Sequence, residues 1–403
     1  MSLLDSPQLV WNTCVDEFNS LMDNTVIPMS NILYTQFVRK KSAWELLMKT
    51  NRKNGSIDMT KIQNYKTSDD IFKRKVMLPK GKSHGIVVLV DNSGSMSEEI
   101  YDIMHNVTAI ALFAKRANIK FEIYTFTSNG YTRNNNLPLG PGDGVFCNDL
   151  KLINIFNSTM STVDIKSVLF EFYIFKKLLG KRDVNKMFEA YTGSFTEASK
   201  LIANLKSMWA SASTPLAPAY LGMLERASLM KESGIQHVSM FTLTDGEGDG
   251  PLCSRDGKAL VSTFLNPFNQ KLYAIDDYKT YEHNNNMYPV NSRCNYSIVM
   301  CNTMAYDFNI DTNHIYLATS IGGSMYTQHS DELLTPFLKN NFASISNVFG
   351  FNSVMVANLS VKHKMSWNST AKEVNSEFAE EYRLKKVKGL LAQSIVDSIC
   401  RYY

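Results

Sequence analysis

Five oxygen-bearing side chains, spread over three segments of the chain, could together bind a metal ion. Asp91, Ser93 and Ser95 alternate along one segment, Thr214 lies in a second, and Asp245 lies in a third. Carboxylate and hydroxyl oxygens are hard ligands, and the set contains neither histidine nor thiolate, which favours magnesium, manganese or calcium over zinc or copper. Because only two of the five groups carry a formal charge, a bound cation would keep exchangeable waters and a position open to an incoming ligand.

The patterns around these residues predict the elements that position them. The aliphatic run Ile86–Val90 predicts a strand buried on both faces, and the apolar face of Ser97–Asn118 predicts the helix that follows it. Gln236–Thr244 predicts another strand, which ends directly before the second aspartate, and Thr214 precedes a predicted helix over 216–232. Since ligands of open α/β sheets bind beyond the carboxyl ends of the strands, we expect the three segments to meet there.

Hydrophobic periodicity and β-branched content predict the remaining elements. Further strands are expected at Lys120–Thr127, His314–Thr319 and Ser353–Leu359, and further helices at Phe195–Ala210, Asp331–Asn340 and Glu377–Tyr403. Strands that alternate with helices indicate an α/β fold, doubly wound, with a mostly parallel sheet and helices on both faces.

The chain is predicted to have three parts. These are a helical N-terminal extension (1–82), a metal-binding domain (83–347), and a C-terminal strand with an amphipathic helix (348–403). Two stretches of the central domain do not fit the alternation. One is an insertion at about 129–193, which opens with a loop rich in asparagine, proline and glycine, and the other is a polar excursion at about 251–312.

Composition limits the classes of partner and compartment. The 403 residues are 44% hydrophobic, enough for a sizeable core, and the net charge of +4 is small for this length. We therefore expect neither a nucleic-acid nor a membrane partner. The six cysteines form no Cys-x-x-Cys pair, and the first residues lack the pattern of a signal peptide, so we expect a cytoplasmic protein.

The sequence offers no recognisable catalytic residue. It contains no phosphate-binding Gly-x-x-x-x-Gly-Lys-Ser/Thr loop, no His-Glu-x-x-His motif and no nucleophile elbow. The segment from Asp91 to Ser95, taken alone, could equally be a helix N-cap cluster, since Asp and Ser are common there. Thr214 and Asp245 make the metal interpretation the better one.

Together, Asp-x-Ser-x-Ser after an apolar strand, a downstream Thr, and Thr-Asp-Gly after a later strand resemble the metal-ion-dependent adhesion site of von Willebrand factor A domains. Asp91, Ser93, Ser95, Thr214 and Asp245 match the five positions of that motif. The form Ser-Thr-Pro-Leu-Ala-Pro-Ala around the threonine is closest to the intracellular branch with the cobaltochelatase subunit. Lys-Ser-His-Gly-Ile before the metal loop is similar to von Willebrand-type proteins of tailed bacteriophages.

This resemblance implies a function as well as a fold. It implies a Mg²⁺-dependent, non-catalytic adaptor whose cation takes a carboxylate from a protein partner, and a separately encoded AAA+ ATPase of the MoxR type as that partner. A phage origin would place it in the host cytoplasm. Two alternatives stay open: a phage virion or assembly component, and a metal-assisted phosphotransferase or hydrolase. For the latter, Glu247 and Asp249 would hold a second cation.

Overall fold

The computed structural model describes most of the chain, including all three segments of the predicted metal site. The described residues are 7–47, 50–67, 72–77, 83–97, 100–128, 145–146, 150–178, 188–189, 192–209, 211–245, 248, 252–253, 263–265, 272–274, 280–283, 286–289, 293–317, 329–340 and 342–357. The predicted C-terminal helix at Glu377–Tyr403 lies outside these residues.

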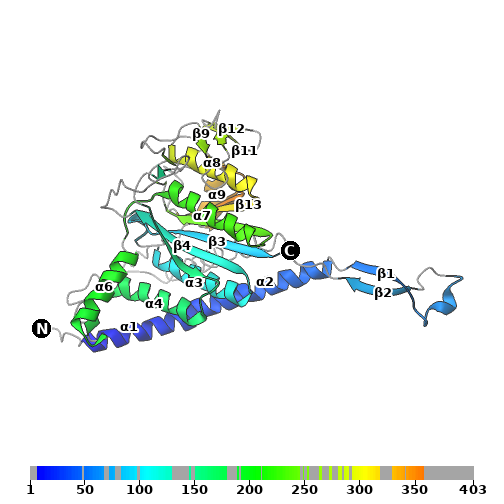
Figure 1. Cartoon of the computed structure of the whole chain (residues 1–403), viewed down its shortest axis with the longest axis horizontal. Coiled ribbons are helices and arrows are strands. Elements are labelled where there is room, and N and C mark those ends of the chain that lie inside the picture. Colours follow the sequence, from blue (N-terminus) through cyan, green and yellow to red (C-terminus); the bar gives the residue numbers. More distant parts are fainter. Residues whose placement is uncertain are drawn as a thin grey trace, which may run out of the picture.

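A seven-stranded sheet forms the centre of the molecule (Figure 1). Its strand order is β14-β15-β13-β7-β3-β4-β6, in which the five inner strands are parallel and both edge strands are antiparallel to their neighbours. The strands are β3 (His84–Asp91), β4 (Lys120–Ser128), β6 (Leu150–Asn157), β7 (His237–Thr244), β13 (Ile310–Leu317), β14 (Phe342–Ile345) and β15 (Ser353–Ala357). The chain therefore has an α/β fold with a mostly parallel sheet, as the sequence predicts.

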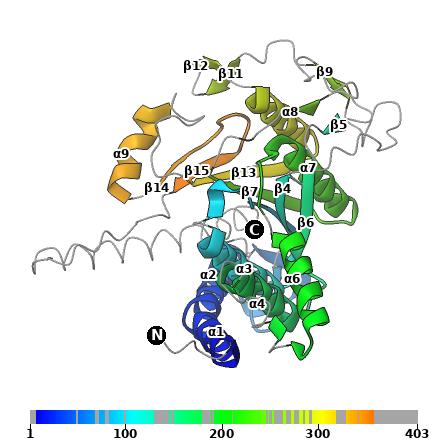
Figure 2. The same ribbon diagram turned by 90° about the vertical axis from the view of Figure 1, so that its left-hand side faces the viewer.

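Helices cover both faces of this sheet (Figure 2). Alternate residues of β3 pack against each layer. Ile86, Val88 and Val90 face one core, whereas Val87 and Leu89 face the other, and all five side chains are fully buried. The first layer contains α1 (Pro7–Leu21), α2 (Ile27–Leu47), α3 (Ile100–Arg116), α4 (Thr162–Leu178) and α6 (Phe195–Trp209). The second contains α7 (Leu216–Glu232), α8 (Arg293–Asp307) and α9 (Ser330–Asn340).

The N-terminal extension is only partly helical, contrary to the expectation for 1–82. Helices α1 and α2 are joined by a π-helical segment, η1 (Met22–Val26), whose buried residues include Met22 and Val26. Beyond α2, the chain forms a hairpin of β1 (Thr50–Ile57) and β2 (Phe72–Met77), with a short 3₁₀ helix η2 (Ile62–Asn64) between the strands. Figure 1 shows this hairpin outside the main body, at the end of α2.

The two stretches interpreted as departures from the fold contribute to it directly. The insertion at 129–193 supplies edge strand β6 and helix α4, and the excursion at 251–312 supplies α8 and the start of β13. The predicted bounds of both departures were too wide. An antiparallel edge strand and a weakly amphipathic helix do not show the strand–helix alternation on which the prediction relied. The described residues of these stretches also include six short strands: β5 (Val145–Phe146), β8 (Leu252–Cys253), β9 (Thr263–Leu265), β10 (Leu272–Ala274), β11 (Thr280–His283) and β12 (Asn286–Pro289).

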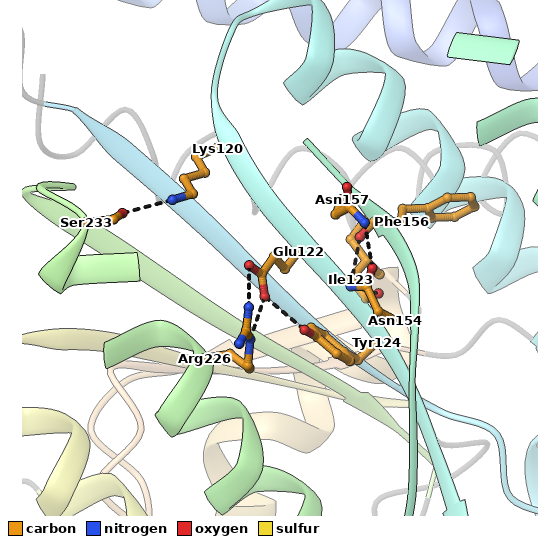
Figure 3. Close-up of polar contacts among 9 residues, drawn as sticks. All are labelled: Lys120, Glu122, Ile123, Tyr124, Asn154, Phe156, Asn157, Arg226 and Ser233. Atoms are coloured by element: carbon orange, nitrogen blue, oxygen red, sulfur yellow. Dashed lines mark hydrogen bonds and ion pairs between the residues drawn. The ribbon is translucent and has the colours of Figure 1, made fainter. Parts of the chain in front are cut away.

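Helix α7 is held against β4 by an ion pair (Figure 3). Arg226 donates two hydrogen bonds of 3.0 Å to the two carboxylate oxygens of Glu122, which also accepts a 2.9 Å bond from the Tyr124 hydroxyl. At the end of the helix, Lys120 donates to the Ser233 hydroxyl at 2.9 Å. These contacts fix the direction of α7, whose first turn follows the loop that contains the predicted threonine ligand.

A bulge shapes the edge of the sheet beside this clamp. The register of β4 and β6 shifts between Ile123 and Tyr124, and the Asn154 side chain donates to the backbone carbonyls of Ile123 and Phe156, at 3.3 Å each (Figure 3). Bulges of this kind interrupt the regular ladder of an edge strand.

None of the described helices is both long and apolar enough to cross a membrane.

Candidate metal centre

The carboxyl ends of β3 and β7 bring two of the three predicted segments together. The strands are parallel neighbours, with Val90 opposite Leu243, so Asp91 and Thr244 are adjacent at the end of the pair. The Thr244 hydroxyl donates a 2.6 Å hydrogen bond to Oδ2 of Asp91, which is completely buried. The residue directly after β7 is the predicted ligand Asp245.

A chain of hydrogen bonds joins the loop of Asp91, Ser93 and Ser95 to this second aspartate. The Ser93 backbone amide donates to Oδ1 of Asp91 at 2.8 Å, which folds the loop back on the strand end. The hydroxyl oxygens of Ser93 and Ser95 are 3.0 Å apart, and Ser95 Oγ donates to Oδ1 of Asp245 at 2.9 Å. Four of the five predicted ligands are therefore in one connected cluster, across 150 residues of sequence.

Backbone contacts hold the loop of Thr214 beside the same cluster. The Gly94 amide of the metal loop donates to the Ala212 carbonyl at 2.9 Å. Thr214 lies two residues after Ala212 in the sequence. The Ala212 amide in turn donates to Thr127 Oγ1 at 2.9 Å, and the Ser213 amide to the Ser128 hydroxyl at 3.1 Å. The Thr214 side chain is buried, and its segment is anchored both to β4 and to the metal loop.

The position of this cluster makes a negative charge costly without a cation. Burial raises the pKa of Asp91 from 3.8 to about 6, although hydrogen bonds from Thr244 and Ser93 oppose the rise. The nearby charge of Asp245 raises it further. Burial also raises the pKa of Asp245 itself, again against a hydrogen bond from Ser95. Ionisation of both neighbouring carboxyl groups is thus less favourable than it is in water.

These features fit a hard divalent cation. A cation would compensate the two carboxylate charges, and the serine and threonine hydroxyls could turn their lone pairs toward it. Within the described residues, no group of three or more His, Cys, Asp and Glu side chains is arranged to hold a metal. Of the five predicted ligands, two are carboxylates and three are hydroxyls, so a cation held by this set alone would keep much of its positive charge.

Some residues that support the site could not be recognised as such in the sequence. Thr244 is the last residue of one predicted strand and the first of the Thr-Asp-Gly triplet, and Thr127 is the last residue of another strand, but neither segment indicates which residue its threonine contacts. Their partners, Asp91 and Ala212, are far away in the sequence. The proposed ligands of a second cation, Glu247 and Asp249, lie outside the described residues.

Comparisons with known proteins assign no family. No family model matches the chain, and no curated protein matches it. Among solved structures, the PilB minor pilin from Streptococcus sanguinis is similar over 83% of this chain and 67% of its own, with 12% identity and a TM-score of 0.37. The open pilus adhesin SpaC from Lactobacillus rhamnosus GG is similar over 80% of this chain, with 12% identity and a TM-score of 0.36.

Human COPII-coat protein Sec24c is similar over 77% of this chain and 32% of its own, with 6% identity and a TM-score of 0.27. The chain spans only 30% of the SpaC adhesin. Similarities at this level do not support any argument about function. The function is therefore inferred from the chemistry of the site.

Proposed function

We propose that this chain is a divalent-cation-dependent protein-binding adaptor. Asp91, Ser93, Ser95, Thr214 and Asp245 would hold the cation, with magnesium as the first choice and manganese or calcium as substitutes. Once bound, the cation would supply an open coordination position for a carboxylate of a protein partner. No residue of the site is assigned a catalytic role.

One observation carries this proposal: the hydrogen-bonded chain from Ser93 through Ser95 to Asp245, next to the buried Asp91. A helix N-cap cluster would need only the loop that precedes α3. Here a carboxylate from a separate strand end completes the cluster, and both aspartates have raised pKa values. Carboxylates and hydroxyls that converge from distant segments are the donor set expected for a hard cation.

Each residue has a distinct task in this proposal. Asp91 and Asp245 provide the negative charge, while Ser93, Ser95 and Thr214 complete the shell without neutralising the cation further. Thr244 orients the Asp91 carboxylate through its 2.6 Å hydrogen bond. An under-neutralised cation attracts an external anion strongly, because its remaining charge is not cancelled by the protein.

The resemblance to von Willebrand factor A domains supports the choice of partner. Because the sequence contains no phosphate-binding loop, ATP hydrolysis would come from a separately encoded AAA+ ATPase of the MoxR type. The same resemblance favours a phage-encoded protein that acts in the host cytoplasm.

Calorimetric titration with Mg²⁺ and Mn²⁺ tests the cation site. Asp245→Asn keeps the shape of the side chain and removes one of only two ligand charges, so we expect a loss of affinity of at least tenfold. Asp311→Asn is the matched control, since it makes the same change in the same sheet, at the amino end of β13. The proposal fails if Asp245→Asn binds both cations as tightly as Asp311→Asn and the unaltered chain do.

A further inference from the structure

The positive charge of the chain is concentrated in one projecting segment. Residues 50–77, which comprise the β1–β2 hairpin and its tip and are called the arm below, contain seven Lys and Arg residues and three Asp residues. Their net charge of +4 equals that of the whole chain, so the remaining residues are balanced. The small overall value therefore conceals a strongly basic arm, which Figure 1 shows outside the main body.

The strand register places like charges opposite one another. Arg52 is paired with Lys75, and Lys53 with Arg74. Like charges at directly opposed positions destabilise an antiparallel pair, and a two-stranded hairpin is only marginally stable by itself in water. A hairpin of this composition gains stability from an anionic surface that lies against it.

The tip of the arm adds exposed apolar side chains to this charge. Met59 is 71% exposed, Tyr65 is 60% exposed, and Ile57 and Ile62 are 45% and 37% exposed. Basic side chains are interspersed with them, and the Lys66 ammonium lies 5.7 Å from the centre of the Tyr65 ring. Four large apolar side chains are thus exposed to water within nine residues at the end of the arm.

The combination of apolar and basic residues distinguishes between anionic partners. Phosphate backbones of nucleic acids would engage the basic residues but offer little to Met59 or the two isoleucines. A stable protein interface needs roughly 20–30 residues a side, and the described tip has eleven, 57–67. A lipid surface accepts a convex apolar tip without shape complementarity, while Lys and Arg around it bind anionic headgroups.

We propose that the arm binds the surface of an anionic lipid bilayer. The side chains of Met59, Ile62 and Tyr65 enter the interfacial region, with the tyrosine at the level of the headgroups, and Lys61 and Lys66 beside them bind the lipid phosphates. The arm lies on the surface and does not span the bilayer. This proposal is independent of the metal site, since no residue of the arm belongs to it.

Sedimentation of the full chain with vesicles tests the proposal. We expect binding to vesicles of phosphatidylcholine mixed with phosphatidylglycerol and much weaker binding to phosphatidylcholine alone. Lys61→Ser and Lys66→Ser should each weaken binding to the mixed vesicles about fivefold, the effect of one basic residue near such a surface. The double variant Met59→Ser/Tyr65→Ser should lower binding by at least tenfold, because it removes the inserted groups.

Two substitutions on the body serve as matched controls. Tyr306→Ser removes an aromatic residue that is 84% exposed on α8, and Lys206→Ser removes an exposed lysine on α6; both should bind vesicles normally. The proposal is overturned if the arm variants bind as the unaltered chain does, or if both vesicle types are bound equally. It is also overturned if duplex DNA or RNA binds through the arm and displaces the vesicles, which would identify a nucleic-acid partner.

A further outcome separates the proposal from a purely protective role of the charge. Basic residues can simply keep the open edges of a hairpin from pairing with other chains. In that case the lysine variants would self-associate while their vesicle binding stayed unchanged, which overturns the proposal. Circular dichroism and Mg²⁺ affinity, both expected to be unaltered in the arm variants, show that the body remains folded.

Discussion

The Asp91 side chain is fully buried, and in the metal-free chain no metal ion compensates the charge of its carboxylate. Its pKa of about 6 lies above the ordinary value of 3.8, so the folded state takes up a proton at a higher pH than the unfolded state does. Ionised Asp91 therefore lowers the free energy of unfolding above pH 6. That loss is recovered as the pH falls from 6 toward 3.8.

Asp91→Asn should consequently stabilise the metal-free protein at neutral pH. The shift corresponds to about 3 kcal/mol at most, and the advantage over the unaltered chain should shrink as the pH falls below 6. Urea unfolding in the presence of a chelator, at a series of pH values, measures the difference. With Mg²⁺ present the order should reverse, because only the unaltered chain gains free energy from the bound cation.

Asp164→Asn provides a control of opposite sign. Hydrogen bonds from Ser161 lower the pKa of Asp164, so its ionised form stabilises the fold above its unfolded pKa, and this contribution is lost as the pH falls. Its replacement should therefore weaken the protein at neutral pH and have no effect in acid. A metal-free Asp91→Asn protein that is less stable than the unaltered chain at pH 7 would contradict the assigned cost of the buried charge.

At the residue scale, the sequence predicts the cluster through its spacing. Alternating ligands directly after an aliphatic run can be recognised locally, and Asp245 follows a recognisable strand end. Their convergence depends on which strands are neighbours, a long-range property that only the structure gives. The supporting roles of Thr244 and Thr127 depend on that neighbourhood too, which is why their own segments do not reveal them.

At the scale of elements, the clamp between α7 and β4 sets the position of the helix that follows the threonine loop. Glu122 is largely buried at 15% side-chain exposure, whereas Arg226 is 40% exposed. We expect a coupling energy of about 1–2 kcal/mol, between the values typical of surface and buried pairs. Thermal or urea unfolding of Glu122→Gln, Arg226→Met and the double variant measures it.

The exposed pair of Glu197 and Lys200 on α6 is the matched comparison. Both side chains are more than half exposed, at 58% and 65%, so their coupling should be below about 0.5 kcal/mol. If both cycles give the same coupling, the Glu122–Arg226 pair has no special part in holding α7. Mg²⁺ affinity should change little in either cycle, because neither pair belongs to the metal cluster.

The elements of the central sheet were predictable where local pattern and tertiary role agree. The predicted helix at 216–232 has the bounds of α7, and the aliphatic run became β3 with both faces buried. Strands were missed where pairing with a neighbouring strand, rather than the local sequence pattern, determines the structure. Strands β6 and β14 pair antiparallel at the sheet edges, and the β1–β2 hairpin is rich in charge and poor in aliphatic residues.

At the scale of the whole molecule, the candidate metal centre and the arm lie at opposite ends of the sheet. Asp91 ends β3, whereas Arg116, the last residue of the returning helix α3, contacts Asn31 and Tyr34 of the helix that leads to the arm. A strand of the length of β3 separates its two ends by about 25 Å. The two proposed binding sites therefore lie on separate parts of the molecule.

This separation predicts that the two surfaces act independently. Substitutions farther apart than about 10 Å, with no shared partners, usually have additive effects. Asp245→Asn should weaken Mg²⁺ binding at least tenfold and leave vesicle binding unchanged. Met59→Ser/Tyr65→Ser should weaken vesicle binding at least tenfold and leave Mg²⁺ binding unchanged. The combined variant should lose both activities by the same factors as its parents. Calorimetry and vesicle sedimentation on all three proteins measure this, and a chelator that altered vesicle binding of the unaltered chain would instead reveal coupling through α3 and α2.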